Sequence, residues 1–210
     1  MARLMIGWKG IVISMNTIIY YEENARQFAD NTRDVDFTSI QNRFLEKIPR
    51  TGKILDFGCG SGRDTKYFLE QGYQVTAIDG SKELCRLTQA YTGIPVKQML
   101  FQELRERNVY DGIWACASVL HLPYEELKSV LRKIEQALKE QGVFYVSFKY
   151  GTFFGMRNGR YFTDMTEETF AELLSDIDNL WIEEQWISSD VRPGREEEKW
   201  LNTILRKRRK

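Results

Sequence analysis

The segment ILDFGCGSG, residues 54–62, constrains the fold of this chain more than any other feature. A short apolar run, 53–57, leads into three glycines within five positions, and a helix-like segment, 64–71, follows. Glycine adopts positive φ angles readily and leaves no side chain between the backbone and a ligand. The first turn of a helix offers free N–H groups. We therefore predict a strand, a glycine-rich turn and a helix whose N-terminus faces a ligand.

Strand-like and helix-like patterns alternate along most of the chain. The predicted strands are 53–57, 73–79, 96–101, 111–117 and 143–150, and the predicted helices between them are 64–71, 82–91 and 123 to about 140. Such alternation is typical of an α/β protein with a doubly wound parallel sheet. Two helices at 20–31 and 37–47 precede this core. A polar segment at 151–165, a helix at 166–175 and strands at 180–187 and 198–206 follow it.

Asp79 is the second feature that indicates a ligand. It ends the second predicted strand, 21 residues after Gly58, where a carboxylate can accept hydrogen bonds from a ribose diol. The glycine spacing is G-x-G-x-G, with Arg63 where the dinucleotide fingerprint needs its third glycine. Asp56 before the loop would repel a pyrophosphate but would tolerate a cationic amino acid or a sulfonium group. An adenosyl ligand of that kind is therefore favoured, with NAD as the alternative.

Three segments together resemble the class I S-adenosylmethionine-dependent methyltransferases. They are ILDFGCGSGRDT (54–65), VTAID (75–79) and YDGIWACASVLHL (110–122). The chain is most similar to the small-molecule branch, which includes ubiquinone-biosynthesis-type and tellurite-resistance-type enzymes, over about residues 20–150. The resemblance implies a Rossmann-like sheet of about seven strands with the last strand antiparallel, for which residues 180–206 would supply the final hairpin. It also implies S-adenosyl-L-methionine as cofactor.

The expected domain organisation follows from the resemblance. We expect residues 1–14 to be a loose N-terminal extension, with Met15 as an alternative start of translation. Residues 15–210 would form a single methyltransferase domain. Within it, 15–50 would be a helical lid, 51–150 the cofactor-binding core, and 151–210 the substrate-side segment with the final hairpin.

The resemblance also assigns cofactor contacts by position. The residues are Asp56, Gly58, Cys59, Gly60, Gly62, Asp79, Gly80, Leu100, Phe101 and Ala117. The glycine loop would surround the methionine part, Asp79 would bind the ribose, and residues 99–101 would lie beside the adenine. Many relatives carry Asp where this chain has Leu100, so backbone groups or Gln102 would have to replace that contact.

His121 is the candidate catalytic residue. It lies just after the fourth predicted strand, and a general base is needed only when the acceptor arrives protonated. A histidine that hydrogen-bonds the loop backbone is the alternative interpretation.

Basic residues gather in the late loops, namely Lys149, Arg157, Arg160, Arg192 and Arg195. Arginine binds carboxylates and phosphates through two parallel hydrogen bonds, so we hypothesise a small, acidic acceptor. Ion pairing with Glu196, Glu197 and Glu198 on a solvated surface is the alternative. The predicted substrate contacts are Tyr21, Lys149, Arg160, Tyr161 and Arg195. Tyr21 would act as a lid aromatic that closes the pocket, or would simply pack the first helix.

Composition excludes several other classes. Lys plus Arg and Asp plus Glu are both 30, and this zero net charge argues against a dedicated nucleic-acid binder. Three cysteines without a CxxC pair and a single histidine predict neither disulfides nor a metal site, and they fit a cytoplasmic protein. No run of about 18 apolar residues predicts a membrane span. The prediction is methyl transfer to a small molecule, with two alternatives: methylation of RNA or protein, and cofactor binding without catalysis.

Overall fold

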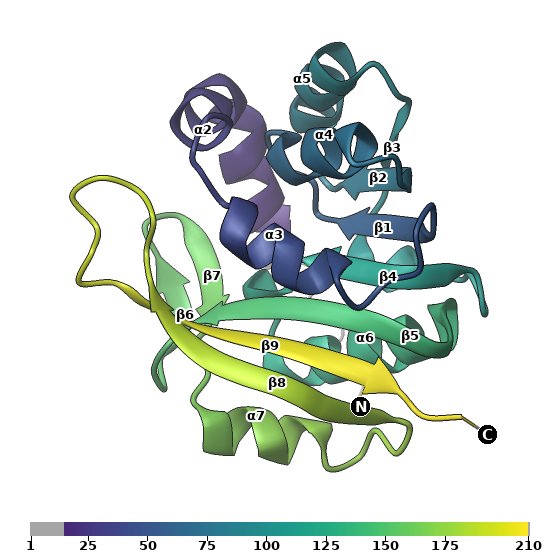
Figure 1. Ribbon diagram of the computed structural model, residues 1–210. Coiled ribbons are helices and arrows are strands. Elements are labelled where there is room, and N and C mark those ends of the chain that lie inside the picture. Colours follow the sequence, from purple (N-terminus) through teal and green to yellow (C-terminus); the bar gives the residue numbers. More distant parts are fainter. Residues whose placement is uncertain (1–14, 210) are drawn as a thin grey trace, which may run out of the picture.

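A seven-stranded sheet forms the centre of the computed structural model, which describes residues 15–209 (Figure 1). The strand order is β3-β2-β1-β4-β5-β9-β8. The bounds are β1 Lys53–Phe57, β2 Gln74–Asp79, β3 Val96–Gln98, β4 Tyr110–Ala115, β5 Leu138–Lys149, β8 Leu180–Ser189 and β9 Lys199–Lys207. The first five strands pair in parallel, and β9 runs antiparallel to both of its neighbours, β5 and β8. The predicted Rossmann-like α/β class with an antiparallel last strand is confirmed.

Helices cover both faces of the sheet (Figure 1). The backbone is helical at 15–23. The helices that follow are α2 Ala25–Thr32, α3 Thr38–Leu45, α4 Arg63–Glu70, α5 Lys82–Thr92, α6 Tyr124–Ala137 and α7 Glu167–Leu174. Two short 3₁₀ turns are η1 Phe101–Glu103 and η2 Val119–His121. The helices α3, α4 and α5 lie on one face, and α6 and α7 lie on the other.

Alternation along β4 shows how the sequence builds two cores. Successive side chains of a strand point to opposite faces of the sheet. Trp114 packs with Phe44 of α3 and Phe68 of α4, and it stacks on Tyr145 with ring centroids 3.9 Å apart. Ile113 points to the other face, into the core built with α6 and α7. Because β4 is buried on both faces, its carboxyl end is held rigidly beside that of β1.

The segment predicted to be irregular contains a hairpin, β6 Phe154–Arg157 and β7 Arg160–Thr163. Its turn residues, Asn158 and Gly159, both have positive φ angles of 49° and 77°, as a two-residue hairpin turn of type I′ requires. Two predicted boundaries also differ. The α6 helix ends at Ala137 because Leu138 already pairs with Tyr110 in the sheet, and β3 ends at Gln98 instead of residue 101.

The helix at 15–23 lies against the β6–β7 hairpin. The Tyr161 N–H donates to Thr17 Oγ1 at 3.0 Å, and Gly159 lies directly beside the Tyr20 ring. The single helix predicted for 20–31 is interrupted at Asn24, so helix 15–23 and α2 are separate elements. The predicted loose extension, 1–14, lies outside the described residues. Between residues 15 and 209, no helix has the length and apolar character needed to cross a membrane.

Candidate functional site

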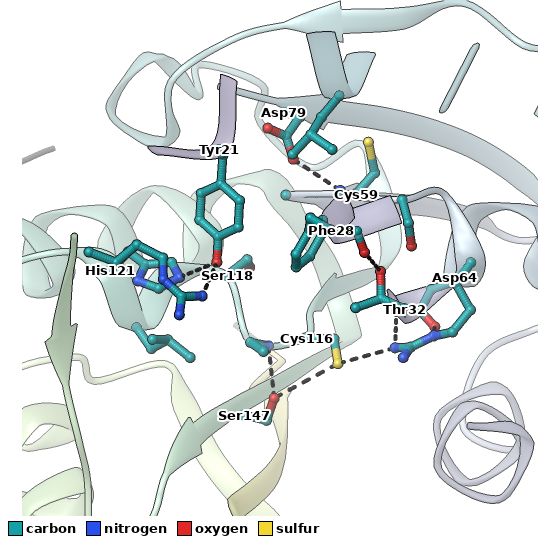
Figure 2. A pocket seen from close by; sticks show the side chains of 18 of the residues that line it. Tyr21, Phe28, Thr32, Cys59, Asp64, Asp79, Cys116, Ser118, His121 and Ser147 are labelled. Atoms are coloured by element: carbon teal, nitrogen blue, oxygen red, sulfur yellow. Dashed lines mark hydrogen bonds and ion pairs between the residues drawn. The ribbon is translucent and has the colours of Figure 1, made fainter. Parts of the chain in front are cut away.

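A cavity lies at the carboxyl ends of the parallel strands. Helix 15–23, α2, the glycine loop, β7 and the segment 188–195 form its walls. Thirteen of the predicted site residues line it: Tyr21, Gly58, Cys59, Gly60, Asp79, Gly80, Leu100, Phe101, Ala117, His121, Lys149, Arg160 and Arg195. Asp56, Gly62 and Tyr161 do not line it. Figure 2 shows Tyr21, His121, Ser118 and Asp79 around the same space.

In the glycine loop, Gly58 and Gly62 are packed too closely to carry a side chain. Gly58 has a φ of 91°, and a Cβ built on it would lie 2.5 Å from the Ser118 Cβ. The Gly58 and Cys59 N–H groups donate to the Ile78 carbonyl at 3.0 and 2.8 Å. Gly62, just before α4, packs on Thr88 and has a φ of 82°. Gly62 therefore shapes the loop from behind and does not face the cavity.

Asp79 sits at the end of β2 as the sequence predicted. Its Oδ2 accepts from the Gly60 N–H at 3.0 Å and its Oδ1 from the Ser81 N–H at 2.9 Å. Burial raises its pKa, and these backbone donors oppose the shift. No ion pair to this carboxylate occurs among residues 15–209. A carboxylate that lines a cavity and forms no ion pair suits a ligand that donates hydrogen bonds, such as a ribose diol.

Asp56 lies beneath the loop and not in the cavity. The Thr65 hydroxyl donates to its Oδ2 at 2.5 Å, and burial together with the neighbouring Asp64 raises its pKa to about 8. The carboxyl is therefore mostly protonated at pH 7. This corrects two expectations: Asp56 does not line the cavity in which the methionine part is expected, and its charge gives no argument against a pyrophosphate. The glycine spacing is the argument that remains.

Arg63 is the cavity residue that sequence reasoning missed. Its Nε and Nη2 donate to the Asp64 carboxylate at 2.8 and 2.9 Å, its Nη2 lies 3.6 Å from Cys116 Sγ, and its guanidinium stacks 4.3 Å from the Phe37 ring centroid. Gln41 and Trp114 also donate to Asp64, which fixes this carboxylate. The sequence signal that could have identified Arg63 is its place as a cation at the first position of the helix that follows the glycine loop.

His121 and Tyr21 form a hydrogen-bonded pair inside the cavity (Figure 2). The Tyr21 Oη lies 2.9 Å from His121 Nε2, and His121 Nδ1 lies 2.6 Å from the Tyr161 carbonyl oxygen. Burial lowers the pKa of His121 to about 4, and it raises the pKa of Tyr21. Tyr161 contributes only backbone groups here, which corrects its predicted role as a substrate contact.

Comparison with known proteins agrees with this geometry. A family model described as "Methyltransferase domain" matches residues 54–142. YqeM, a protein of Bacillus subtilis (strain 168) described as a methyltransferase, is 30% identical over 150 residues, which are 64% of this chain and 54% of YqeM. The ubiquinone biosynthesis O-methyltransferase of Rickettsia canadensis (strain McKiel) is 28% identical over 100 residues, 45% of this chain and 42% of that protein. Residues 54–142 therefore match a methyltransferase domain, and they lie in a fold shared with S-adenosylmethionine-dependent methyltransferases. The chain spans about half the length of these two relatives.

A solved methyltransferase structure shares the fold over nearly the whole chain. It is the 1,6-didemethyltoxoflavin-N1-methyltransferase of Burkholderia thailandensis, with bound 1,6-didemethyltoxoflavin and S-adenosylhomocysteine. The TM-score is 0.74 and the identity 24%, and the match covers 95% of this chain and 89% of that one. The fold expected from the resemblance is thereby confirmed.

The part of the cavity where we expect the adenine is apolar. Leu100 is 39% exposed and lines the cavity with Phe101, next to Gly80. The Gln102 amide donates to Glu126 at 2.6 Å. That amide is already engaged, so Gln102 does not substitute freely for the acidic side chain that many relatives carry at Leu100.

The predicted basic residues gather only in part. Lys149, Arg160, Arg192 and Arg195 line the cavity, whereas Arg157 lies outside it and pairs with Asp164. Three of these four cations have carboxylate partners: Arg192 pairs with Asp190, and both Lys149 and Arg195 pair with Glu198.

Arg160 is the exception among these cations. Its guanidinium stacks on the rings of Tyr20, Tyr21 and Phe162 and donates to Tyr21 Oη at 3.3 Å, and its Nε is buried without a hydrogen-bond partner. The four cations therefore face two carboxylates. This wall of the cavity has a positive excess.

Proposed function

We propose that this chain transfers the methyl group of S-adenosylmethionine to a small anionic acceptor. One observation carries the proposal. A single cavity joins Asp79 and the glycine loop to a wall on which Lys149, Arg160, Arg192 and Arg195 outnumber their carboxylate partners.

The residues present fit the cofactor. Asp79 has acceptor capacity left for the ribose hydroxyls, and the glycine loop leaves no side chain in the path of the methionine part. The Arg63 guanidinium would meet the cofactor's carboxylate, and Leu100 with Phe101 would flank the adenine. When bound, the cofactor supplies a sulfonium-activated methyl group. The task of this chain is then to place the acceptor in line with that methyl group and to exclude water.

Two relatives support a small acceptor. The Burkholderia thailandensis structure holds 1,6-didemethyltoxoflavin, and the Rickettsia canadensis relative is named for ubiquinone biosynthesis. The positively charged wall of the cavity supports an acceptor that is acidic. Arginine and lysine in a partly desolvated site bind carboxylates and phosphates through charge-assisted hydrogen bonds.

Calorimetric titration tests the cofactor. S-adenosylmethionine and S-adenosylhomocysteine should bind, NAD should not, and Asp79→Ala should weaken binding about 100-fold or more, as expected for two lost charge-assisted hydrogen bonds. Asp178→Ala, which removes an exposed carboxylate that does not line the cavity and whose chain neighbours do not line it either, is the control and should leave binding unchanged. Failure of both adenosyl compounds to bind, or tighter binding of NAD, would contradict the proposal.

An acceptor panel tests the substrate class. The probes are 3,4-dihydroxybenzoate, 3-aminopropionate and 3-mercaptopropionate, each beside its uncharged amide, with release of S-adenosylhomocysteine as the readout. Carboxylates should be methylated in preference to their amides. Arg160→Gln should raise KM about tenfold, the loss of one charged hydrogen bond, and Arg157→Gln should not. Equal turnover of the amides would refute an anionic acceptor. Turnover confined to RNA or protein, with a steep dependence on salt, would favour a macromolecular acceptor.

A further inference from the structure

The tautomer of His121 follows from its partners. A carbonyl oxygen can only accept, so the contact between Nδ1 and the Tyr161 oxygen at 2.6 Å places the proton on Nδ1. Nε2 then carries the lone pair and accepts from the Tyr21 hydroxyl at 2.9 Å. The hydrogen bonds therefore run in one direction, from Tyr21 through the imidazole to the Tyr161 carbonyl.

Tyr21 Oη is the end of this series of hydrogen bonds that faces the cavity (Figure 2). It donates to His121 and accepts one hydrogen bond from Arg160 at 3.3 Å. A phenol oxygen has two lone pairs, so one remains for a further donor. A proton-bearing acceptor group in the cavity is such a donor.

We propose that Tyr21 is a catalytic residue that takes the acceptor's proton while its own proton passes to His121 Nε2. This inference rests on the proposed function. As the bond between the acceptor atom and the methyl carbon forms, the carbon–sulfur bond breaks and sulfur keeps its electron pair. The acceptor's proton moves to Tyr21 Oη, the Tyr21 proton moves to Nε2, and the resulting imidazolium keeps its Nδ1–H on the Tyr161 carbonyl.

The electrostatics select the kind of acceptor. Burial holds the pKa of His121 at about 4, and the Arg160 charge acts in the same direction, so the imidazole is a weak base. It accepts a proton only after methyl transfer has made that proton strongly acidic. A hydroxyl or a ring N–H meets this condition. A methylated alkylamine does not, because its pKa stays near that of lysine, about 10. The inferred acceptor is an acidic molecule that carries a hydroxyl or a heteroaromatic N–H.

Three separate elements assemble the relay. Tyr21 comes from helix 15–23, His121 from η2 and Arg160 from β7. The helix is seated by the Tyr161 N–H on Thr17 and by Glu22, which accepts from the Ser81 hydroxyl at 2.6 Å. Tyr21 therefore reaches His121 only while this helix covers the cavity, and proton acceptance is coupled to closure.

The single histidine of the chain gives a readout that needs no acceptor. Nitrogen-15 NMR of the intact protein should show the Nδ1–H tautomer and a titration well below that of free imidazole. Tyr21→Phe should shift the Nε2 resonance. Tyr20→Phe, which removes a hydroxyl one residue away and keeps the stacking on Arg160, should not. An Nε2–H tautomer, or an Nε2 resonance that ignores Tyr21→Phe, would overturn the relay.

Turnover separates catalysis from packing. With 3,4-dihydroxybenzoate, Tyr21→Phe should lower kcat about 100-fold, the usual contribution of a proton-transfer group, while the affinity for S-adenosylhomocysteine stays within about threefold. Tyr20→Phe should retain kcat. Undiminished kcat in Tyr21→Phe, or faster turnover of 3-aminopropionate than of the hydroxyl compound, would refute the inference. Absence of cofactor binding would instead refute the proposed function. The NMR result would then show only whether Tyr21 donates to His121.

Discussion

Replacement of Gly58 by Ala tests whether the glycine loop is packed against η2 or merely needs a flexible residue. The added Cβ would lie 2.5 Å from the Ser118 Cβ and 3.1 Å from a ring carbon of Phe101. The Gly58 backbone also has a φ of 91°, which alanine adopts only with strain. Two separate costs therefore act at this position.

The magnitudes can be separated. A left-handed backbone costs an alanine about 1–2 kcal/mol. Forcing a methyl group into a filled space costs about 1–3 kcal/mol more. Gly58→Ala should therefore lower the free energy of unfolding by about 2–5 kcal/mol. Gly72→Ala is the matched control, because Gly72 has a φ of 85° but no atom within 4 Å of its added Cβ, and it should lose only the strain.

A double-mutant cycle measured by urea unfolding isolates the clash. Ser118→Gly removes the obstructing Cβ and also the 2.6 Å hydrogen bond from the Ser118 hydroxyl to the Phe57 carbonyl, at about 1 kcal/mol. In that background, Gly58→Ala should cost no more than Gly72→Ala does, with a coupling of about 1–3 kcal/mol. If Gly58→Ala costs the same as Gly72→Ala in the native background, the close packing described here is wrong.

Three further outcomes are expected. Burial raises the pKa of Asp79, and ribose hydroxyls donate to its ionised form. The affinity for S-adenosylmethionine, measured by calorimetry, should therefore fall as the pH drops from 7.5 to 5. An Asp79→Asn variant should bind weakly at both pH values. In the folded protein the pKa of Asp56 is about 8, above the ordinary aspartate value of 3.8, so the folded state holds a proton that the unfolded chain releases above pH 4. Stability should therefore fall between pH 5 and 8, and urea unfolding of Asp56→Asn should show a smaller fall. Glu22→Ala removes the hydrogen bond from Ser81 and loosens helix 15–23. Cofactor release, measured by stopped flow, should become about fivefold faster, which is the equivalent of one hydrogen bond. An unchanged rate would contradict the role of Glu22 in holding this helix.

Local patterns predicted most of the sheet. The strand at 53–57, the glycine turn and Asp79 depend on residues close together in the chain, and the structure has them in place. The β6–β7 hairpin also has a local sequence signal, because Asn158-Gly159 is a strong two-residue turn sequence. The polar character of its neighbours concealed it.

Side-chain partners could not be predicted in the same way. Tyr21 and His121 lie 100 positions apart, and only the fold brings them together. The same holds for Glu198, which pairs with Lys149 across 49 positions and so neutralises part of the expected basic cluster. The buried state of Asp56 also depends on its surroundings, and this is why an argument from its formal charge failed.

The position of β9 between β5 and β8 sets an order of events during synthesis. Both neighbours leave the ribosome before β9 does, and in the finished sheet each of them pairs with β9 and not with the other. The hydrogen-bonding edge of β5, in which residues 142 to 148 are all buried in the finished protein, stays open until β9 has emerged. An open apolar edge is prone to pair with other chains. Nascent chains stalled before residue 199 should therefore aggregate or require a chaperone, whereas chains that include β9 should close the sheet.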